Sequence, residues 1–443
     1  MQIVARLTLP WREPAAALAP FADEPWAMAL VSGGGGPRGR WSYVLRAPEA
    51  TLVVAPDAET DAFTALRDLA GEAAPSLADG PPFQGGLAGL AAYELGARAE
   101  GLTLARTGWP DLAVGRYPSL LAFDHDRREV VALGRGADVA AAEARAAQAA
   151  AWLDAPAPER LAGALSTGFE SLDAPASYEA AVAEVVARIR DGELFQANIA
   201  RRWAGRLANG ARPIDVLQRL IAESPAPFAA YLRLEGRALV SNSPERFVSA
   251  DVGGDLETRP IKGTRRRGAT PAEDAAERAW LAASPKDRAE NLMIVDLMRN
   301  DLSRVSSPGS VAAPQLFEVE TFANVHHLVS TVTGRLAPGA SSLDLLARAF
   351  PPGSITGAPK VQAMKLIAAL EPPRGPYCGA LFWAGFDGAF DSSVLIRTLA
   401  FEQSEGGWAF EARAGAGIVA DSDPVAERLE TEAKIAALQG ALR

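Results

Sequence analysis

The sequence predicts an α+β protein, built either as two domains or as one large domain with two sheets. Its 443 residues exceed what a single small hydrophobic core usually holds. Residues 1–135 alternate short β-like runs with turns, and the runs at 42–45 and 51–54 are bounded by Pro and Gly. Residues 137–152 are rich in Ala and predict a helix. Strands and helices are therefore both expected.

A stretch of Pro and Ala at 154–158 predicts a connection between two parts of the chain. We expect an N-terminal, β-rich region over 1–165, interwoven with a core over 166–443. The core begins with a predicted helix that Ser177 caps and Gly192 ends. Most motifs that suggest chemistry lie in the core.

Composition excludes several classes of protein. The formal net charge is −10, which disfavours nucleic acid as a partner. One cysteine and three histidines rule out an intramolecular disulfide and disfavour a zinc site. The N-terminus lacks the pattern of a signal peptide, and no apolar run is long enough to span a membrane. These features predict a cytoplasmic protein with no membrane partner.

A glycine run at 33–36 follows Ser32 and invites comparison with a phosphate-binding loop. The Gly-Lys-Ser/Thr that completes such a loop is missing, and no helical pattern follows. We therefore expect a hairpin loop at this position.

Two predicted helices carry paired acids. Ser284 and Pro285 can start the first helix, on which Asp287 and Glu290 share the face of an apolar stripe. A carboxylate aimed at a core is costly unless it is paired or binds a metal, so a buried salt bridge and a metal site are both open.

The second helix can start at Asp423, and it places Glu427, Glu430 and Lys434 on one face. Alone, that face predicts a solvated stripe with a Glu430–Lys434 pair. Together, the two helices suit a hard cation such as Mg²⁺, which prefers carboxylates, waters and a substrate anion.

Other segments carry weaker signals. Lys262 lies in Pro-Ile-Lys-Gly-Thr, followed by Arg265, Arg266 and Arg267, whose charge would lower the pKa of a nearby lysine. Most such lysines are surface residues. A strand at 194–201 puts Gln196 on its polar face, which solvent alone would explain. The loop 351–360 enters a helix, and the loop 415–417 is rich in Gly; the backbone of either could hold an anion.

In this order and spacing, these segments resemble the chorismate-utilising enzymes, a family that includes anthranilate, aminodeoxychorismate, isochorismate and salicylate synthases. The resemblance covers about residues 175–440, and more loosely the N-terminal Pro25-Trp26 and Gly39–Tyr43 segments. It implies two large, mostly antiparallel sheets that face each other, with helices outside and the active site between them.

By position, the resemblance implies Mg²⁺ ligands at Glu290 and Glu430, with Asp287 and Glu427 as the second acid of each pair. Glu245, in Ser-Pro-Glu, matches the general acid for the departing C4 hydroxyl. The implied substrate-binding residues are Thr264, His327, Tyr377, Arg397, Gly415, Ala416, Gly417, Lys434 and Gln196.

Two positions choose between members of the family. Gln196 stands where water-adding members carry a lysine base, and glutamine cannot act as that base. Lys262 stands where anthranilate synthases carry alanine, and a lysine there is typical of aminodeoxychorismate synthases. The resemblance therefore implies that Lys262 attacks C2 of chorismate, that ammonia then adds at C4, and that 4-amino-4-deoxychorismate leaves. For that attack, we expect the arginines and burial together to lower the pKa of Lys262.

Cys378 lacks the glycine-rich setting of a glutaminase nucleophile, so ammonia is expected from a separate glutamine amidotransferase subunit. Anthranilate synthase component I is the alternative within the family, and a non-catalytic regulatory subunit is the alternative from another class. The acids and Lys262 argue against the latter, because a subunit without catalysis has no need of them.

Overall fold

The computed structural model describes residues 2–33, 39–159, 161–322 and 325–443. Most of the predicted glycine-rich hairpin loop, residues 34–36, lies outside these ranges. The described chain forms a 12-stranded and a 10-stranded sheet, in which every strand pairing is antiparallel. The predicted α+β architecture with two large antiparallel sheets is confirmed.

The 12-stranded sheet has the order β1 (Ile3–Pro10), β8 (Glu129–Gly136), β7 (Ser119–Asp124), β3 (Trp41–Leu45), β2 (Met28–Val31), β11 (Phe228–Leu234), β12 (Arg237–Ser243), β21 (Thr398–Ser404), β22 (Gly407–Ile418), β10 (Gln196–Arg206) and β18 (Gly357–Ala358), with β9 (Glu170–Ser171) paired to β10. The 10-stranded sheet has the order β15 (Ile261–Arg266), β17 (Val325–Arg335), β14 (Asp255–Thr258), β13 (Arg246–Ala250), β20 (Phe390–Val394), β19 (Ala380–Gly385), β5 (Gly86–Ala91), β6 (Leu112–Tyr117) and β4 (Ala50–Val54), with β16 (Ala312–Thr321) paired to β17.

The helices are α1 (Pro14–Leu18), α2 (Ala62–Ala70), α3 (Leu95–Ala99), α4 (Val139–Ala150), α5 (Pro175–Arg190), α6 (Pro213–Glu223), α7 (Pro271–Ala283), α8 (Pro285–Ser303), α9 (Ser342–Ala349), α10 (Lys360–Leu370) and α11 (Pro424–Leu442). Short 3₁₀ turns are η1 (Ala19–Phe21), η2 (Ala151–Asp154) and η3 (Gly353–Ile355). Helix α5 begins at Pro175 with Ala174 at the cap, so the predicted cap at Ser177 is wrong by three residues. Among the described residues, no helix is both long enough and apolar enough to cross a membrane.

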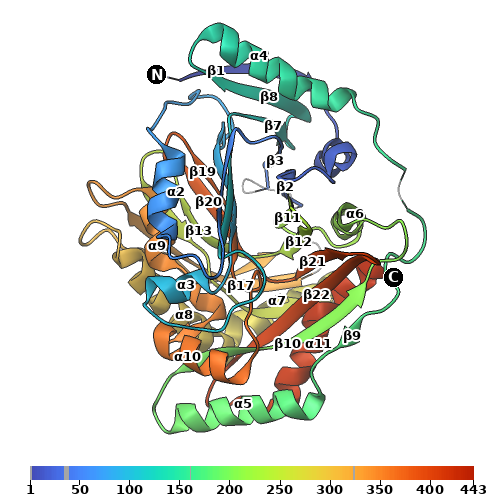
Figure 1. The fold of residues 1–443 in the computed structure, drawn as a ribbon. Helices are drawn as coiled ribbons and strands as arrows, with labels where there is room; N and C mark the ends of the chain where they lie inside the picture. The colour runs from blue at the N-terminus through green and yellow to red at the C-terminus, as the bar shows by residue number, and fades with distance from the viewer. Residues whose placement is uncertain (1, 34–38, 160, 323–324) are drawn as a thin grey trace.

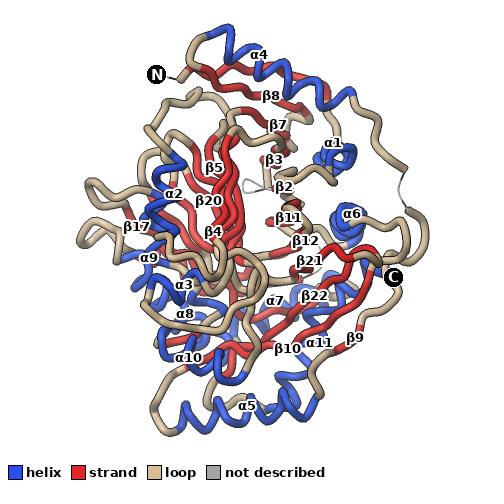
Figure 2. The backbone as a smooth tube through the Cα atoms, viewed as in Figure 1, coloured by secondary structure: helices blue, strands red, loops and turns tan. Residues whose placement is uncertain are grey.

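One buried cluster draws side chains from both sheets and shows that the sheets face each other. Tyr43 of the first sheet and Trp383 of the second pack edge to face, with ring centroids 6.2 Å apart. Two further clusters lie on the outer faces, where helices cover the strands. Figure 1 shows α2, α8 and α9 beside the 10-stranded sheet, and the blue helices of Figure 2 flank the red strands in the same way.

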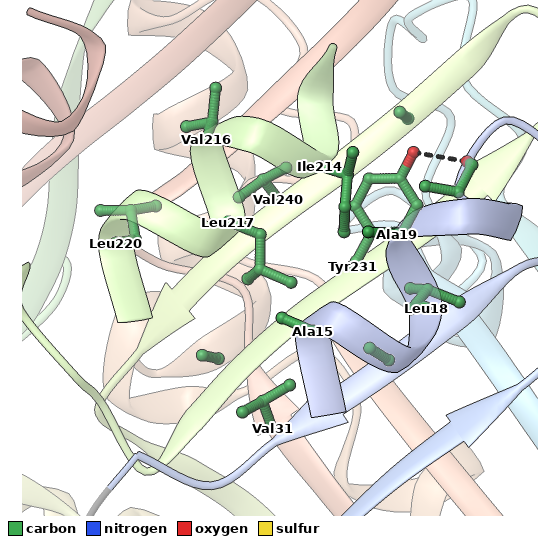
Figure 3. Close-up of a cluster of buried hydrophobic side chains, with 14 of the residues drawn as sticks. Ala15, Leu18, Ala19, Val31, Ile214, Val216, Leu217, Leu220, Tyr231 and Val240 are labelled. Carbon is green, nitrogen blue, oxygen red and sulfur yellow. Dashed lines mark hydrogen bonds between the residues drawn. The ribbon is translucent and has the colours of Figure 1, made fainter. Parts of the chain in front are cut away.

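The outer cluster of the 12-stranded sheet shows how helices cover it. Figure 3 shows Leu18 of α1 and Leu217 of α6 converging on Tyr231 of β11. Full burial of one such leucine contributes about 1.5–3 kcal/mol. The hydroxyl of Tyr231 donates to the carbonyl of Ala22 at 2.8 Å, so this polar group is paired although it is buried.

The first 165 residues contribute strands to both sheets: β1, β2, β3, β7 and β8 to one, and β4, β5 and β6 to the other. β2 pairs with β11 and β5 with β19, so these strands are bonded directly to later ones. The boundary at residue 165 itself stays a prediction. The C-terminal strands β10 and β22 lie in one sheet and β15 and β17 in the other, and α8 and α11 pack on them.

Candidate active site

A cavity of about 510 Å³ lies between the two sheets, where β10 and β22 face β15 and β17 and where α8 and α11 approach. Nearly all of the residues that the sequence singled out line it. Those residues are Glu245, Lys262, Thr264, Asp287, Glu290, His327, Tyr377, Arg397, Gly415, Gly417, Glu427, Glu430 and Lys434. The fold thus gathers side chains that lie as far as 189 positions apart, from Glu245 to Lys434, into one place.

Glu245 is buried in the turn between β12 and β13, with 6% of its surface exposed. Its Oε1 accepts a hydrogen bond of 2.6 Å from the hydroxyl of Ser354. Burial raises the pKa of Glu245, although Ser354 and the ammonium of Lys262 oppose that rise. A carboxyl group that holds its proton in a cavity can act as a general acid.

Lys262 projects from β15 into the same cavity. Burial lowers its pKa, and the like charge of Lys434 lowers it further. The lowered pKa and its cause by burial agree with the sequence, but the second expected cause, the three neighbouring arginines, does not. Arg265 pairs with Glu277 and Arg267 with Asp274, each at 2.6 Å, and no arginine is among the main causes of the shift.

Gly263 lets the chain pass close to helix α8 beside Lys262. Its φ is +74°, in the left-handed region, and the pairing with β17 is irregular between Lys262 and Thr264. A Cβ at Gly263 would lie 2.8 Å from Leu281 Cδ1 and 3.0 Å from Asp287 Cβ. Only glycine therefore fits between the lysine and the helix that carries the first pair of acids.

Both acid-bearing helices begin as the sequence predicted. The hydroxyl of Ser284 accepts from the backbone N–H of Asp287 at the start of α8, and Asp423 accepts from Ala426 N–H at the start of α11. Pro285 and Pro424 occupy the first turn of each helix. The caps fix where each helix starts, and thus which face carries the acids.

Lysine side chains lie close to the acids of both helices. Burial raises the pKa of both Glu290 and Glu427. Lys286 Nζ lies 3.8 Å from Glu290 Oε1, and the hydroxyl of Ser422 donates to Glu427 at 2.7 Å. Carboxylates with raised pKa values at a partly open cavity are groups that a cation would stabilise.

The acids are compatible with a hard cation, but they do not form a closed cage. Within the described ranges, no group of three or more His, Cys, Asp or Glu side chains is gathered tightly enough to hold a metal ion. Mg²⁺ commonly takes one or two carboxylates and completes its shell with waters and substrate oxygens. Glu290 of α8 and Glu430 of α11 fit that limited role.

Other residues of the cavity offer groups for an organic anion. Thr264 Oγ1 lies 2.9 Å from His327 Nδ1, and burial lowers the pKa of His327 to about 4, so its ring is neutral at pH 7. The guanidinium of Arg397 lines the cavity without a carboxylate partner anywhere in the described chain, and burial lowers its pKa. A cation left unpaired in this way suits a substrate carboxylate.

Two glycines of β22, Gly415 and Gly417, also line the cavity. A Cβ at Gly415 would lie 3.0 Å from Tyr377 Oη, and one at Gly417 would lie 2.4 Å from Gln196 Nε2. Both positions therefore need glycine, because atoms of neighbouring residues fill the space that a side chain would take. Lys434 Nζ donates to the carbonyl of Gly415 at 2.9 Å, which ties α11 to this strand.

The sequence matches the family described as chorismate binding enzyme over residues 33–440. The chain belongs to this family. It is 41% identical to aminodeoxychorismate synthase component 1 of Klebsiella aerogenes, over 97% of each chain. It is 40% identical to anthranilate synthase component 1 of Streptomyces coelicolor, over 93% of this chain and 82% of that protein.

Solved structures agree with this assignment to the chorismate-binding family. Anthranilate synthase component I from Streptococcus pneumoniae superposes with a TM-score of 0.80 at 28% identity, covering 92% of this chain and 93% of that one. The menaquinone-specific isochorismate synthase MenF of Escherichia coli shares the fold alone, with a TM-score of 0.75 at 17% identity and with 100% of this chain and 95% of that one covered.

Two of the predicted substrate-binding residues of this chorismate-binding chain lie behind the cavity wall. Gln196 is 2% exposed and sits behind Gly417, so it is not the solvent-exposed side chain that its strand position allowed. The side chain of Ala416 packs with α5 and α10. Neither residue lines the cavity, so either one could affect a ligand only through the residues that it contacts.

The loop 351–360 contributes differently from what its sequence suggested. Lys360, at the start of α10, pairs with Asp301 at 2.8 Å and donates to the carbonyl of Ala349, outside the cavity. Ser354 and Ile355 of this loop do line the cavity, as do Asn198, Lys286 and Arg413 elsewhere. Sequence reasoning gave these five no role in the site, although Ser354 and Ile355 lay within the highlighted loop and Asn198 shared the polar face of the predicted strand with Gln196.

Proposed function

We propose that this chain aminates chorismate with ammonia to form 4-amino-4-deoxychorismate. The observation that carries the proposal is Lys262, an amine in the cavity whose burial and neighbour Lys434 lower its pKa. The two sets of relatives, named aminodeoxychorismate and anthranilate synthase component 1, are almost equally identical to this chain. The lysine is therefore the feature that favours amination at C4 over the anthranilate reaction.

The reaction needs a nucleophile, an acid and a site for two carboxylates. Lys262, as a neutral amine, attacks C2 of the ring, the two conjugated ring double bonds each shift by one position, and the C4–O bond breaks. Glu245 gives its proton to the departing oxygen, which leaves as water. Ammonia then adds at C4 and expels the Lys262 amine, and the Glu245 carboxylate takes back one proton from the new ammonium group.

The remaining residues hold the substrate. Arg397, Tyr377 and the backbone at 415–417 suit the enolpyruvyl carboxylate, while Thr264 and His327 flank the ring. Glu290 and Glu430, with Asp287 and Glu427 beside them, would hold a Mg²⁺ ion together with the ring carboxylate. Such an ion, when bound, draws electron density from the ring and so makes C2 a better electrophile.

Ammonia is proposed to come from a separate glutamine amidotransferase, in keeping with the name "component 1" of the relatives. Cys378 supports a separate source of ammonia, because it is fully buried and burial raises its pKa to about 12. A glutaminase needs an accessible cysteine with a low pKa. The cytoplasmic location stays a prediction from the sequence.

Product analysis tests the proposal. The purified chain is incubated with chorismate, MgCl₂ and an ammonium salt, and the products are identified by mass spectrometry. Aminodeoxychorismate keeps the pyruvyl group, whereas anthranilate formation releases pyruvate. Anthranilate with free pyruvate as the main products would favour the alternative, and no loss of chorismate would favour a non-catalytic subunit.

A further inference from the structure

Ser354 contacts both of the groups to which the proposed function gives chemistry. Its hydroxyl donates to Glu245 Oε1 at 2.6 Å, and its carbonyl oxygen lies 3.5 Å from Lys262 Nζ. It is 4% exposed in the 3₁₀ turn η3 and lines the cavity. One residue therefore joins the turn that carries the acid to the strand that carries the amine.

The turn that carries Ser354 is held from both sides. Thr356 Oγ1 donates to the carbonyl of Pro352 at 2.8 Å, and Arg374 Nη1 donates to the carbonyl of Ile355 at 3.2 Å. Arg374 is itself fixed by Glu371 at 3.0 Å. These bonds fix the turn on both sides of Ser354, so the position of its hydroxyl is set by the fold rather than by a flexible loop.

The two contacts direct the reactive atoms. Because the hydroxyl occupies Oε1 of Glu245, the proton of the acid is directed to Oε2, the oxygen left free. When a neutral Lys262 directs one N–H toward the Ser354 carbonyl, its lone pair points elsewhere. Donor and acceptor directions are restricted in this way because hydrogen bonds weaken steeply away from linearity.

We propose that Ser354 is a positioning residue, which directs the proton of Glu245 toward the departing C4 oxygen and the lone pair of Lys262 toward C2. This inference rests on the proposed roles of those two residues. It names a residue that neither the sequence motifs nor the comparisons assign.

The side chain of Ser354 can be removed without removing its carbonyl. Ser354→Ala keeps the contact to Lys262 and deletes only the donor to Glu245. We expect kcat for chorismate consumption to fall about ten- to a hundredfold, a part of what a general acid contributes, with KM for chorismate unchanged. Ser354→Cys keeps the size but offers only a weak donor, so it should lose activity in the same way.

A double-mutant cycle separates positioning from packing. If Ser354 acts through Glu245, adding Ser354→Ala to Glu245→Gln should change kcat by less than about twofold, because the acid is already gone. Ser342→Ala, at a serine of α9 that is 5% exposed and outside the cavity, is the matched control and should keep wild-type activity. Melting temperatures of all variants report folding.

Three outcomes would overturn the inference: near wild-type activity of Ser354→Cys, near wild-type activity of Ser354→Ala, or a further tenfold loss in the Glu245→Gln background. Activity is measured as chorismate consumed, whichever product forms. A failure of the proposed function would appear in the identity of the product, while the double-mutant cycle could still hold.

Discussion

Lys434 Nζ lies 2.6 Å from Glu430 Oε1, one turn earlier on α11. Partial burial raises the pKa of Glu430, but Lys434, together with Lys262 and Lys286, lowers it by more. Glu430 therefore stays ionised, while burial raises the pKa of Glu290 on the facing helix. The surroundings of the two proposed metal ligands therefore shift their pKa values in opposite directions, and a bound cation would favour the ionised form of both.

Replacing Glu290 with glutamine tests the cation site. The amide keeps the shape but removes the charge, so we expect at least a hundredfold loss of turnover at every Mg²⁺ concentration, with the melting temperature little changed. Asp296→Asn is the control, because Asp296 is an exposed acid on the same helix. Near-normal activity of Glu290→Gln across a Mg²⁺ titration would show that Glu290 is not a metal ligand.

Lys262 should form a covalent adduct. Chorismate and Mg²⁺ without ammonia should leave a mass increase on the peptide that contains Lys262, found after proteolysis. Lys262→Ala should lose most aminodeoxychorismate formation, and Lys262→Arg should also fail because arginine stays protonated. Lys365→Ala on α10, where the lysine is exposed, should behave as wild type. Absence of the adduct, with normal product from Lys262→Ala, would reject the mechanism.

The chain alone should use ammonium salts and not glutamine. At fixed total ammonium, the rate should rise with pH as more free NH₃ becomes available to attack. A competing fall would follow only where Glu245 loses its proton, which burial resists by raising its pKa. The measurement is initial rate against pH, with glutamine substituted for ammonium in a parallel series. Glutamine-dependent product from the pure chain would contradict this prediction.

His327 should make the fold sensitive to mild acid. Its pKa falls from an ordinary value of 6.5 to about 4 in the folded state, so between these values the unfolded chain binds a proton that the folded chain does not. Stability is then complete above about pH 6.5 and falls with pH toward 4. In urea unfolding, the free energy of unfolding of His327→Gln minus that of the wild type should therefore rise by about 2 kcal/mol when the pH is lowered from 7 to 5. A difference in unfolding free energy between variant and wild type that does not change with pH would contradict this prediction.

The buried pair of Lys360 and Asp301 should matter for stability rather than for chemistry. Lys360→Met leaves a buried carboxylate unpaired and should destabilise the fold by about 3 kcal/mol. Burial already raises the pKa of Asp301 to about 6, so protonation relieves the penalty at low pH and the loss grows as pH rises. Urea midpoints at several pH values test this. Adding Asp301→Asn should remove the pH dependence.

The caps of α8 and α11 could be predicted from the local sequence alone. Ser284 with Pro285 and Asp423 with Pro424 start helices by contacts within one turn, so their prediction needed no tertiary information. The same holds for strands such as β3 and β4, which are bounded by turn residues. The cap predicted at Ser177 is wrong because Pro175 can occupy the first turn of α5, so the helix starts earlier, with Ala174 at the cap.

Sequence by itself determined the family, the helices that carry the acids, and most of the residues that line the cavity, because these depend on residue type and spacing along the chain. Tertiary structure alone decided what surrounds each group. It identified Lys434, instead of the neighbouring arginines, as the like charge that lowers the pKa of Lys262, placed Gln196 behind Gly417, and brought Ser354 to Glu245 across 109 positions. Desolvation and hydrogen bonding act between groups that are close in space, and no local pattern records which distant groups will meet.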